Sequence, residues 1–154
     1  TENLKFSFVQ KIGKKSEKGE CIIAYPKKIF CKYDGRYNKI LVSNGKSLVI
    51  NSDKNNQYYR YRLDKTPLNL ILDRNFIINK MIDSEILSSS LDHYYFKVTD
   101  DKTTIIIYFD KNTLDLIGWT TKDVYQNKVE TKISNLKNNL MINENIFKLQ
   151  NYIN

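Results

Sequence analysis

Long apolar runs are absent from this sequence of 154 residues, and the residues that favour helices and flexible turns are few. No run approaches the roughly 20 apolar residues that a helix needs to cross a bilayer. Only one alanine (Ala24), five glycines and two prolines occur, which argues against a mainly helical fold. Since 41% of the residues are hydrophobic and 27% are charged, we expect neither an integral membrane protein nor a disordered chain.

Residues that carry catalysis or bind metals are equally scarce. The sequence has one histidine, His93, and two cysteines, Cys21 and Cys31, which lie ten positions apart without the usual spacing of metal ligands. It contains no glycine-rich phosphate loop and no nucleophile elbow. We therefore expect neither an enzyme nor a metal or cofactor site, and we interpret His93 as a solvated turn residue.

Aromatic and β-branched residues are abundant instead, with eleven tyrosines, seven phenylalanines and many isoleucines, a composition typical of strands. Short apolar runs alternate with turn residues along the chain, and its length suits a single domain, 1–154, with its own core. We expect a polar loop at 13–19, and strands near residues 6–10, 20–25, 28–33, 40–43, 47–50, 57–63, 85–87, 94–98, 103–109, 114–121 and 128–136.

Successive hairpins predict a mainly β (α+β) fold, an incomplete antiparallel β-barrel or strongly curved sheet. The pair Asn44-Gly45 between two apolar runs is a strong hairpin signal, and we expect both residues to take positive φ. Alternation such as Ile105, Ile107 and Phe109 is typical of a sheet with one apolar and one wet face. The fold prediction includes a short helix over the concave apolar face.

One segment has the start signal of a helix. Thr66 is the expected N-cap and Pro67 the first helical residue. Leu68, Ile71 and Leu72 then follow at the i, i+3, i+4 spacing of one helix face. We expect a helical lid made of Pro67, Leu68, Leu70, Ile71 and Leu72, and a second helical piece over residues 73–81.

The two cysteines lie in expected neighbouring strands joined by a turn at Pro26-Lys27. If the pairing register sums to 52, Cys21 and Cys31 are direct partners on one sheet face, and the geometry allows a disulfide. In the reduced form they would be two small apolar residues on a buried face.

The net charge of +8 favours anionic lipid or acidic protein partners. Residues 58–62 interleave aromatic and cationic side chains, as stacking surfaces for nucleic acids do. Tyr59 and Tyr61 would nevertheless lie on one face of a strand, and Tyr58, Arg60 and Arg62 on the other, as in an amphipathic strand. We therefore expect no nucleic-acid partner and keep a basic nucleic-acid-binding β-barrel only as a lesser alternative.

The order of several short motifs along nearly the whole chain resembles the periplasmic outer-membrane lipoprotein carrier family, the LolA-like proteins. The most specific match is L-V-S-N-G-K-S-L at 41–48, which is similar to the family's L-V-S-D-G-K-x-L hairpin. The other matching motifs are Phe8-Val9-Gln10, Gly19 followed by a strand to Tyr25-Pro26, T-P-L-N-L-I-L at 66–72, Leu116–Trp119, Val129–Asn135 and Phe147.

The resemblance implies a monomeric periplasmic carrier with a helical lid over an apolar cavity. Such a carrier takes acylated lipoproteins from an ATP-driven, ABC-type inner-membrane exporter to the outer membrane, where an acceptor can receive them. The alternative on the same fold is an outer-membrane lipoprotein acceptor or an envelope-stress sensor. Alternation and family position together predict the lining of the cavity as Phe8, Cys21, Ile23, Tyr25, Ile29, Cys31, Leu48, Ile50, Tyr59, Tyr61, Ile105, Ile107, Phe109 and Trp119.

The sequence departs from the family pattern in three places. The family's arginine before proline, implicated in holding the lid, is Tyr25 here, and a tyrosine has no fork of charged donors. The aromatic pair after that proline is replaced by Ile29 and Cys31. Only Thr1 to Lys5 precede the first expected strand, so we expect the family's N-terminal helix to be short or missing and any signal peptide to have been removed.

Overall fold

The computed structural model describes residues 3–54, 57–73, 75, 79, 88–89, 93–100, 103–113, 115–122 and 125–153. Eleven strands form one antiparallel sheet, and a short helical segment, residues 63–72, packs against it. The strands are β1 (Asn3–Ile12), β2 (Lys15–Ala24), β3 (Lys28–Tyr33), β4 (Ile40–Asn44), β5 (Ser47–Ser52), β6 (Gln57–Arg62), β7 (Ser88–Ser89), β8 (His93–Asp100), β9 (Thr103–Asp110), β10 (Leu116–Lys122) and β11 (Lys128–Asn138). The helical turns are η1 (Leu63–Lys65), α1 (Leu68–Ile71), η2 (Glu144–Phe147) and η3 (Leu149–Asn151).

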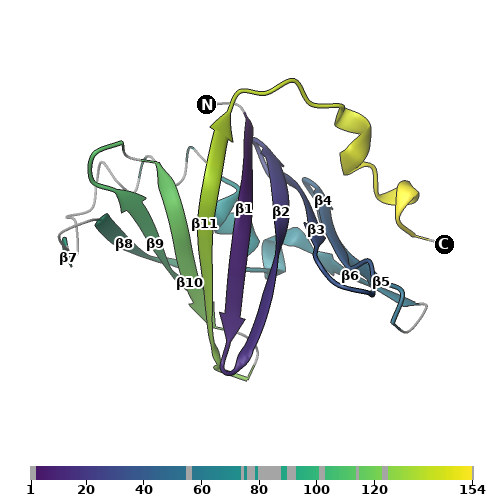
Figure 1. Ribbon diagram of the computed structural model, residues 1–154, viewed down its shortest axis with the longest axis horizontal. Helices are drawn as coiled ribbons and strands as arrows, with labels where there is room; N and C mark the ends of the chain where they lie inside the picture. Colours follow the sequence, from purple (N-terminus) through teal and green to yellow (C-terminus); the bar gives the residue numbers. More distant parts are fainter. Residues whose placement is uncertain are drawn as a thin grey trace.

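The strand order is β6-β5-β4-β3-β2-β1-β11-β10-β9-β8-β7. The first strand of the chain, β1, and the last, β11, therefore pair at the centre of the sheet. Within the described residues β6 and β7 are the two edges and do not pair, so the sheet is not closed. Figure 1 shows the two wings diverging from β1 and β11, with the teal helical segment behind these strands. The predicted curved, incomplete barrel is confirmed.

Alternation along the strands separates an apolar concave face from a polar outer face. In β1, Leu4, Phe6 and Phe8 are buried while Lys5 is exposed. In β9, Ile105, Ile107 and Phe109 are buried in the same way. These side chains form one hydrophobic core with Leu63, Leu70, Ile71 and Leu72 of the helical segment. The segment therefore covers the concave face because that face has the apolar surface that its leucines need.

Several local predictions were wrong at turns. The polar loop expected at 13–19 is only a tight turn at Gly13 (φ 58°), because residues 15–18 pair with β1. In the hairpin at 44–47, Gly45 has positive φ but Asn44 does not. The Asn44 Oδ1 atom instead accepts hydrogen bonds from the backbone N–H groups of Lys46 and Ser47. A turn of this kind needs only one left-handed residue.

The start of the helix also differs from the prediction. Pro67 is the N-cap of α1, and the Thr66 hydroxyl does not cap it. That hydroxyl donates to the Leu63 carbonyl oxygen of the preceding turn, at 2.8 Å. The predicted strand at 85–87 and most of the predicted helix at 73–81 lie outside the described residues.

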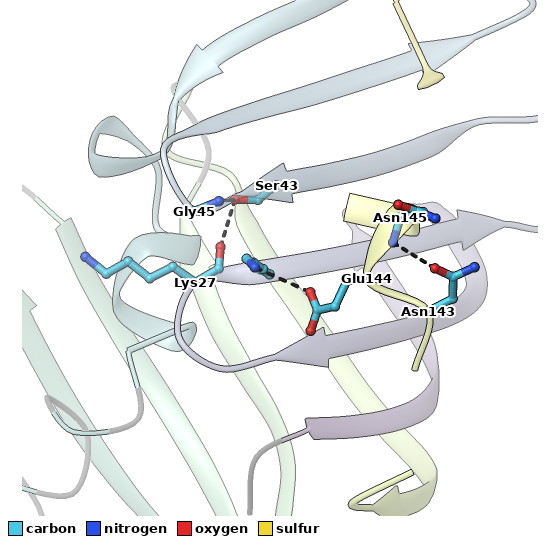
Figure 2. Close-up of polar contacts among 7 residues, drawn as sticks. Lys27, Ser43, Gly45, Asn143, Glu144 and Asn145 are labelled. Carbon is cyan, nitrogen blue, oxygen red and sulfur yellow. Dashed lines mark hydrogen bonds and ion pairs between the residues drawn. The ribbon is translucent and has the colours of Figure 1, made fainter. Parts of the chain in front are cut away.

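The C-terminal segment crosses to the outer face of β3, β4 and β5 (yellow in Figure 1). There Leu149 joins Val42 and Val49 in a second, small apolar cluster. An ion pair between Lys28 and Glu144, at 3.4 Å, and the Asn143 side-chain cap of η2 accompany this packing (Figure 2). The segment leaves the concave face free of the C-terminal residues.

Candidate functional site

The candidate site is a cavity of about 190 Å³ between the helical segment and the concave face of the sheet. Its sheet wall comes from strands of both wings, and its other wall comes from the start of the helical segment. Most of the lining is apolar, because the concave positions of these strands are the core positions of the fold. The lining residues are Phe8, Gln10, Cys21, Ile29, Cys31, Tyr33, Leu41, Leu48, Thr66, Pro67, Leu68, Ile71, Trp119, Thr121 and Thr131.

The structure divides the predicted cavity residues into three groups. Those that line the cavity are Phe8, Cys21, Ile29, Cys31, Leu48, Trp119 and, from the predicted lid, Pro67, Leu68 and Ile71. Those that belong to the same hydrophobic core without lining the cavity are Ile23, Ile105, Ile107, Phe109, Leu70 and Leu72, with Tyr25 and Ile50 half-buried against it. Those that are exposed are Tyr59 and Tyr61.

The two exposed tyrosines lie on the expected face but on an edge strand. Tyr59 pairs with Ile50 and Tyr61 with Leu48, so all four point to the concave side of the sheet. Their side chains are 51% and 46% exposed because, among the described residues, no strand pairs with the outer edge of β6. They extend the apolar wall into solvent and do not enclose the cavity.

Sequence reasoning missed the polar residues of the cavity. The Gln10 side chain donates to the Thr131 hydroxyl at 3.2 Å, across the pairing of β1 with β11. Thr121 and Thr131 are both buried on the same side of the sheet as Trp119. Gln10 lies two residues after Phe8, and Thr121 lies two residues after Trp119. The alternation that identified Phe8 and Trp119 therefore also identifies Gln10 and Thr121. The cavity therefore has apolar walls with a small polar strip.

Tyr33 also lines the cavity, and it lies two residues after Cys31 on the same face of β3. Its ring packs edge-on against Phe8, with centroids 5.0 Å apart, and it is buried. Burial, and then the nearby Glu17 carboxylate, raise the pKa of Tyr33 well above its ordinary value. The phenol is therefore a neutral hydrogen-bonding group at the end of the cavity.

A disulfide joins Cys21 to Cys31 in the cavity wall. The two residues are direct partners in the pairing of β2 with β3, which is the register anticipated from the sequence. The bond closes a short loop through the turn at Pro26-Lys27. It ties together two strands that line the cavity, so it stiffens the wall without crossing the opening.

Removing this disulfide by the double substitution Cys21→Ala and Cys31→Ala is expected to lower the free energy of unfolding by about 2–3 kcal/mol, the chain-entropy effect of so short a loop. Urea unfolding of the variant and of the wild type, each with and without reductant, measures the difference. Reductant should shift only the wild type. Equal midpoints for the oxidised wild type and the variant would show that the bond adds no stability.

The helical segment is held at both ends by backbone hydrogen bonds. At its start the Leu63 N–H donates to the Lys46 carbonyl oxygen, and at its end the Leu72 carbonyl oxygen accepts from the Lys27 N–H, both at 2.9 Å. The Lys27 carbonyl oxygen accepts from the Ser43 hydroxyl at 2.8 Å, and the same hydroxyl accepts from the Gly45 N–H at 3.0 Å (Figure 2). The fully buried Ser43 therefore links the two turns that hold the helical segment.

His93, interpreted from the sequence as a solvated turn residue, begins β8 and is half-buried on the outer face. Its ring lies 5.5 Å from that of Tyr108 and 6.1 Å from that of Tyr95. The prediction of a turn was wrong because β8 begins at His93, one residue before the predicted strand at 94–98. In the part of the chain that the structure describes, no group of three His, Cys, Asp or Glu side chains is placed to hold a metal ion.

The family comparison decides the class of protein. The model of the family described as outer membrane lipoprotein carrier protein LolA matches residues 1–150. The chain belongs to this family. The resemblance found in the sequence is confirmed, and the LolA family is one of carrier proteins. A comparison with curated proteins found no match.

Solved structures share the LolA-family fold at low identity. A DUF1329 family protein from Desulfovibrio piger is 10% identical, with a TM-score of 0.55 over 99% of this chain and 92% of that chain. An uncharacterized conserved protein from Thermus thermophilus is 6% identical, with a TM-score of 0.53 over 95% and 84%. A LolA superfamily protein from Nitrosomonas europaea is 9% identical, with a TM-score of 0.49 over 95% and 89%. At these identities the likeness concerns the fold alone. None of the described helices has the length and hydropathy of a membrane-spanning helix.

Proposed function

We propose that this LolA-family protein is a periplasmic carrier that binds the acyl chains of lipoproteins in the cavity under the helical segment. It would take them, as a monomer, from an ATP-driven inner-membrane exporter to an acceptor or directly to the outer membrane. The observation that carries the proposal is the cavity itself, whose sheet wall and helical wall are both mostly apolar. An acyl chain can replace the contacts of Leu68 and Ile71 with the sheet without exposing either surface to water.

The size of the cavity indicates that the helical segment is closed against the sheet. Its volume of about 190 Å³ is below the roughly 300–1,000 Å³ of typical small-molecule pockets. Cargo therefore requires the helical segment to move away from the sheet. Each buried methylene is worth about 0.8 kcal/mol, so one long acyl chain supplies roughly 10 kcal/mol toward displacing the segment.

The arrangement of β6 favours this proposal over the nucleic-acid alternative. Tyr59 and Tyr61 point to the concave side, while Arg60 and Arg62 point to the outer side, since neighbouring residues of a strand alternate between faces. The Arg62 guanidinium is also paired with Asp64 at 2.8 Å. Of the three tyrosines of β6, Tyr58 alone shares the outer face with the two arginines, so β6 lacks the row of aromatic rings among cations that a stacking surface needs.

Substituting Leu68 by glutamate is expected to weaken binding of a lysophospholipid at least tenfold, because a carboxylate would enter the apolar cavity without a partner. Leu68 is half-buried, which makes it a safer site than the fully buried Ile71. The fluorescence of Trp119, the single tryptophan and part of the cavity wall, measures binding directly. The matched control is Asn69→Glu, on the same helix but outside the lining, which should bind as the wild type does.

Two results would contradict the proposal. One is a wild-type protein whose Trp119 fluorescence does not respond to any acyl-bearing lipid. The other is equal binding by the Leu68→Glu and wild-type proteins. Mass spectrometry of the lipids and lipoproteins that co-purify with the protein from a periplasmic extract then identifies the cargo class.

A further inference from the structure

The concave face carries a second and larger pocket, of about 500 Å³, beside the apolar cavity. It lies where β3 ends and β5 and β6 approach the loop at 34–39, at the opposite end of these strands from the helical segment. Its lining is polar, aromatic and charged. The lining residues are Lys15, Glu17, Tyr33, Asp34, Gly35, Arg36, Tyr37, Lys39, Ile50, Ser52, Lys54, Gln57 and Tyr59.

Backbone hydrogen bonds hold the rim of this pocket on three sides. The Tyr33 N–H donates to the Lys39 carbonyl oxygen at 3.0 Å and closes the loop. The Asp34 N–H donates to the Lys18 carbonyl oxygen at 2.8 Å, and the Asp53 N–H donates to the Tyr37 carbonyl oxygen at 2.7 Å. The rim is therefore attached to β2 and to the end of β5 as well as to β3.

The charges of the pocket favour an anion. Four cations, Lys15, Arg36, Lys39 and Lys54, line it with two carboxylates, Glu17 and Asp34. The Lys39 ammonium lies 3.1 Å from each carboxylate oxygen of Glu17 and so neutralises it. The remaining three cations face one carboxylate, so the pocket attracts a phosphate or carboxylate group.

Aromatic rings position the cations at the pocket. The Arg36 guanidinium lies 5.0 Å and the Lys54 ammonium 5.7 Å from the centre of the Tyr37 ring. The Lys39 ammonium lies 4.3 Å from the centre of the Tyr33 ring. These distances are within the range of cation–π attraction. The rings therefore keep the charged groups near the rim.

The polar pocket and the apolar cavity adjoin at Tyr33, which lines both. Ile50 of the pocket pairs with Leu41 of the cavity, and Tyr59 pairs with Ile50 on the same face. The concave face thus changes along the strands from apolar under the helical segment, through Tyr33 and Ile50, to cationic at the rim. This sequence of surfaces matches a molecule with an acyl chain next to an anionic group.

We propose that the polar pocket binds the anionic group, a phosphate or carboxylate, of an amphiphile whose acyl chain occupies the apolar cavity. This inference rests on the proposed function and adds a selectivity to it. The carrier prefers acylated cargo in which a negative charge lies close to the acyl chain. The neutral phenol of Tyr33 lies at the boundary, where it can donate to the ester or headgroup oxygen between the two parts.

The test compares two single-chain lipids with the same acyl chain, anionic lysophosphatidylglycerol and uncharged monoacylglycerol, below the concentrations at which they aggregate. Trp119 fluorescence follows binding to the wild type, to an Arg36→Gln/Lys54→Gln variant and to a Lys97→Gln/Lys132→Gln control. The control removes the same charge from the outer faces of β8 and β11. Glycerol phosphate, which has no acyl chain, tests for a site that binds free phosphate esters; calorimetry measures its binding, since Trp119 lines the apolar cavity and not the polar pocket.

We expect the wild type to bind lysophosphatidylglycerol about tenfold more tightly than the monoacylglycerol, and the preference to shrink as added salt screens the exposed cations. The Arg36→Gln/Lys54→Gln variant should lose the preference while binding the monoacylglycerol as before, and the Lys97→Gln/Lys132→Gln control should keep it. Equal affinities for both lipids in every protein would overturn the inference and leave the carrier function intact. Failure of both lipids to bind would instead reject the carrier function, and glycerol phosphate binding as tightly as lysophosphatidylglycerol would show a site for free phosphate esters only.

Discussion

Replacing Gly19 by alanine is expected to lower the free energy of unfolding by at least about 4 kcal/mol, an exceptional loss for one methyl group. Gly19 lies in β2, where it pairs with Phe8 of β1 and Tyr33 of β3. A Cβ atom at this position would lie 2.2 Å from the Lys32 carbonyl oxygen and 2.9 Å from the Tyr33 Cα atom. Both contacts are with backbone, so the strands themselves would have to separate.

The same displacement would move Tyr33, which lines both pockets, so lipid binding should weaken together with stability. Urea unfolding followed by Trp119 fluorescence measures the loss. Gly13→Ala is the contrasting control, since Gly13 has the left-handed backbone (φ 58°) that Gly19 lacks, but no atom lies within 4 Å of the added Cβ. Its cost should be only the left-handed strain, about 1–2 kcal/mol. A Gly19→Ala protein no less stable than Gly13→Ala would refute the close-approach argument.

Replacing Ser43 by alanine is expected to cost about 3–4 kcal/mol and to loosen the helical segment. The Ser43 hydroxyl is the partner of both the Lys27 carbonyl oxygen and the Gly45 N–H in a fully buried position, and each buried group that loses its partner costs about 1–3 kcal/mol. The Lys27 turn also donates to Leu72 at the end of the helical segment. Hydrogen exchange of the Lys27 amide should therefore become faster in the variant.

Ser47→Ala is the control for this experiment, because the Ser47 hydroxyl accepts a long hydrogen bond, of 3.4 Å, from the exposed Arg60 side chain. Its stability and its exchange should match those of the wild type within about 0.5 kcal/mol. If Ser43→Ala and Ser47→Ala behave alike, the turns do not hold the helical segment and packing of its leucines alone does. In that case lipid uptake by the two variants should also be equal.

The role expected of Tyr25 changes in the light of these contacts. In the sequence, Tyr25 stands in place of the family's arginine and has no fork of charged donors with which to hold the lid. In the structure the turn that follows Tyr25 contacts the helical segment through the Lys27 backbone N–H, a donor that does not depend on side-chain identity. Tyr25 itself is half-buried against the core.

Much of the fold follows from the period-two alternation of the sequence. The alternation predicted which residues of β1 and β9 face the core, because successive side chains of a strand point to opposite sides. It also predicted the pairing of Cys21 with Cys31, since a short turn between two strands determines their register. The spacing of Leu68, Ile71 and Leu72 identified the helical segment, whose leucines need an apolar face to cover.

Other features depend on which parts of the chain lie side by side, which no local pattern contains. Tyr59 and Tyr61 alternate as core residues do, yet they are exposed because β6 is an edge. Thr66 is of a residue type and at a position typical of an N-cap, but its hydroxyl donates to the Leu63 carbonyl oxygen of the preceding turn. Tyr33 joins two pockets only because the loop at 34–39 folds back beside β2 and β5. Alternation therefore determined which side chains share a face, and the tertiary structure decided what covers them, since burial depends on neighbours that are distant in the chain.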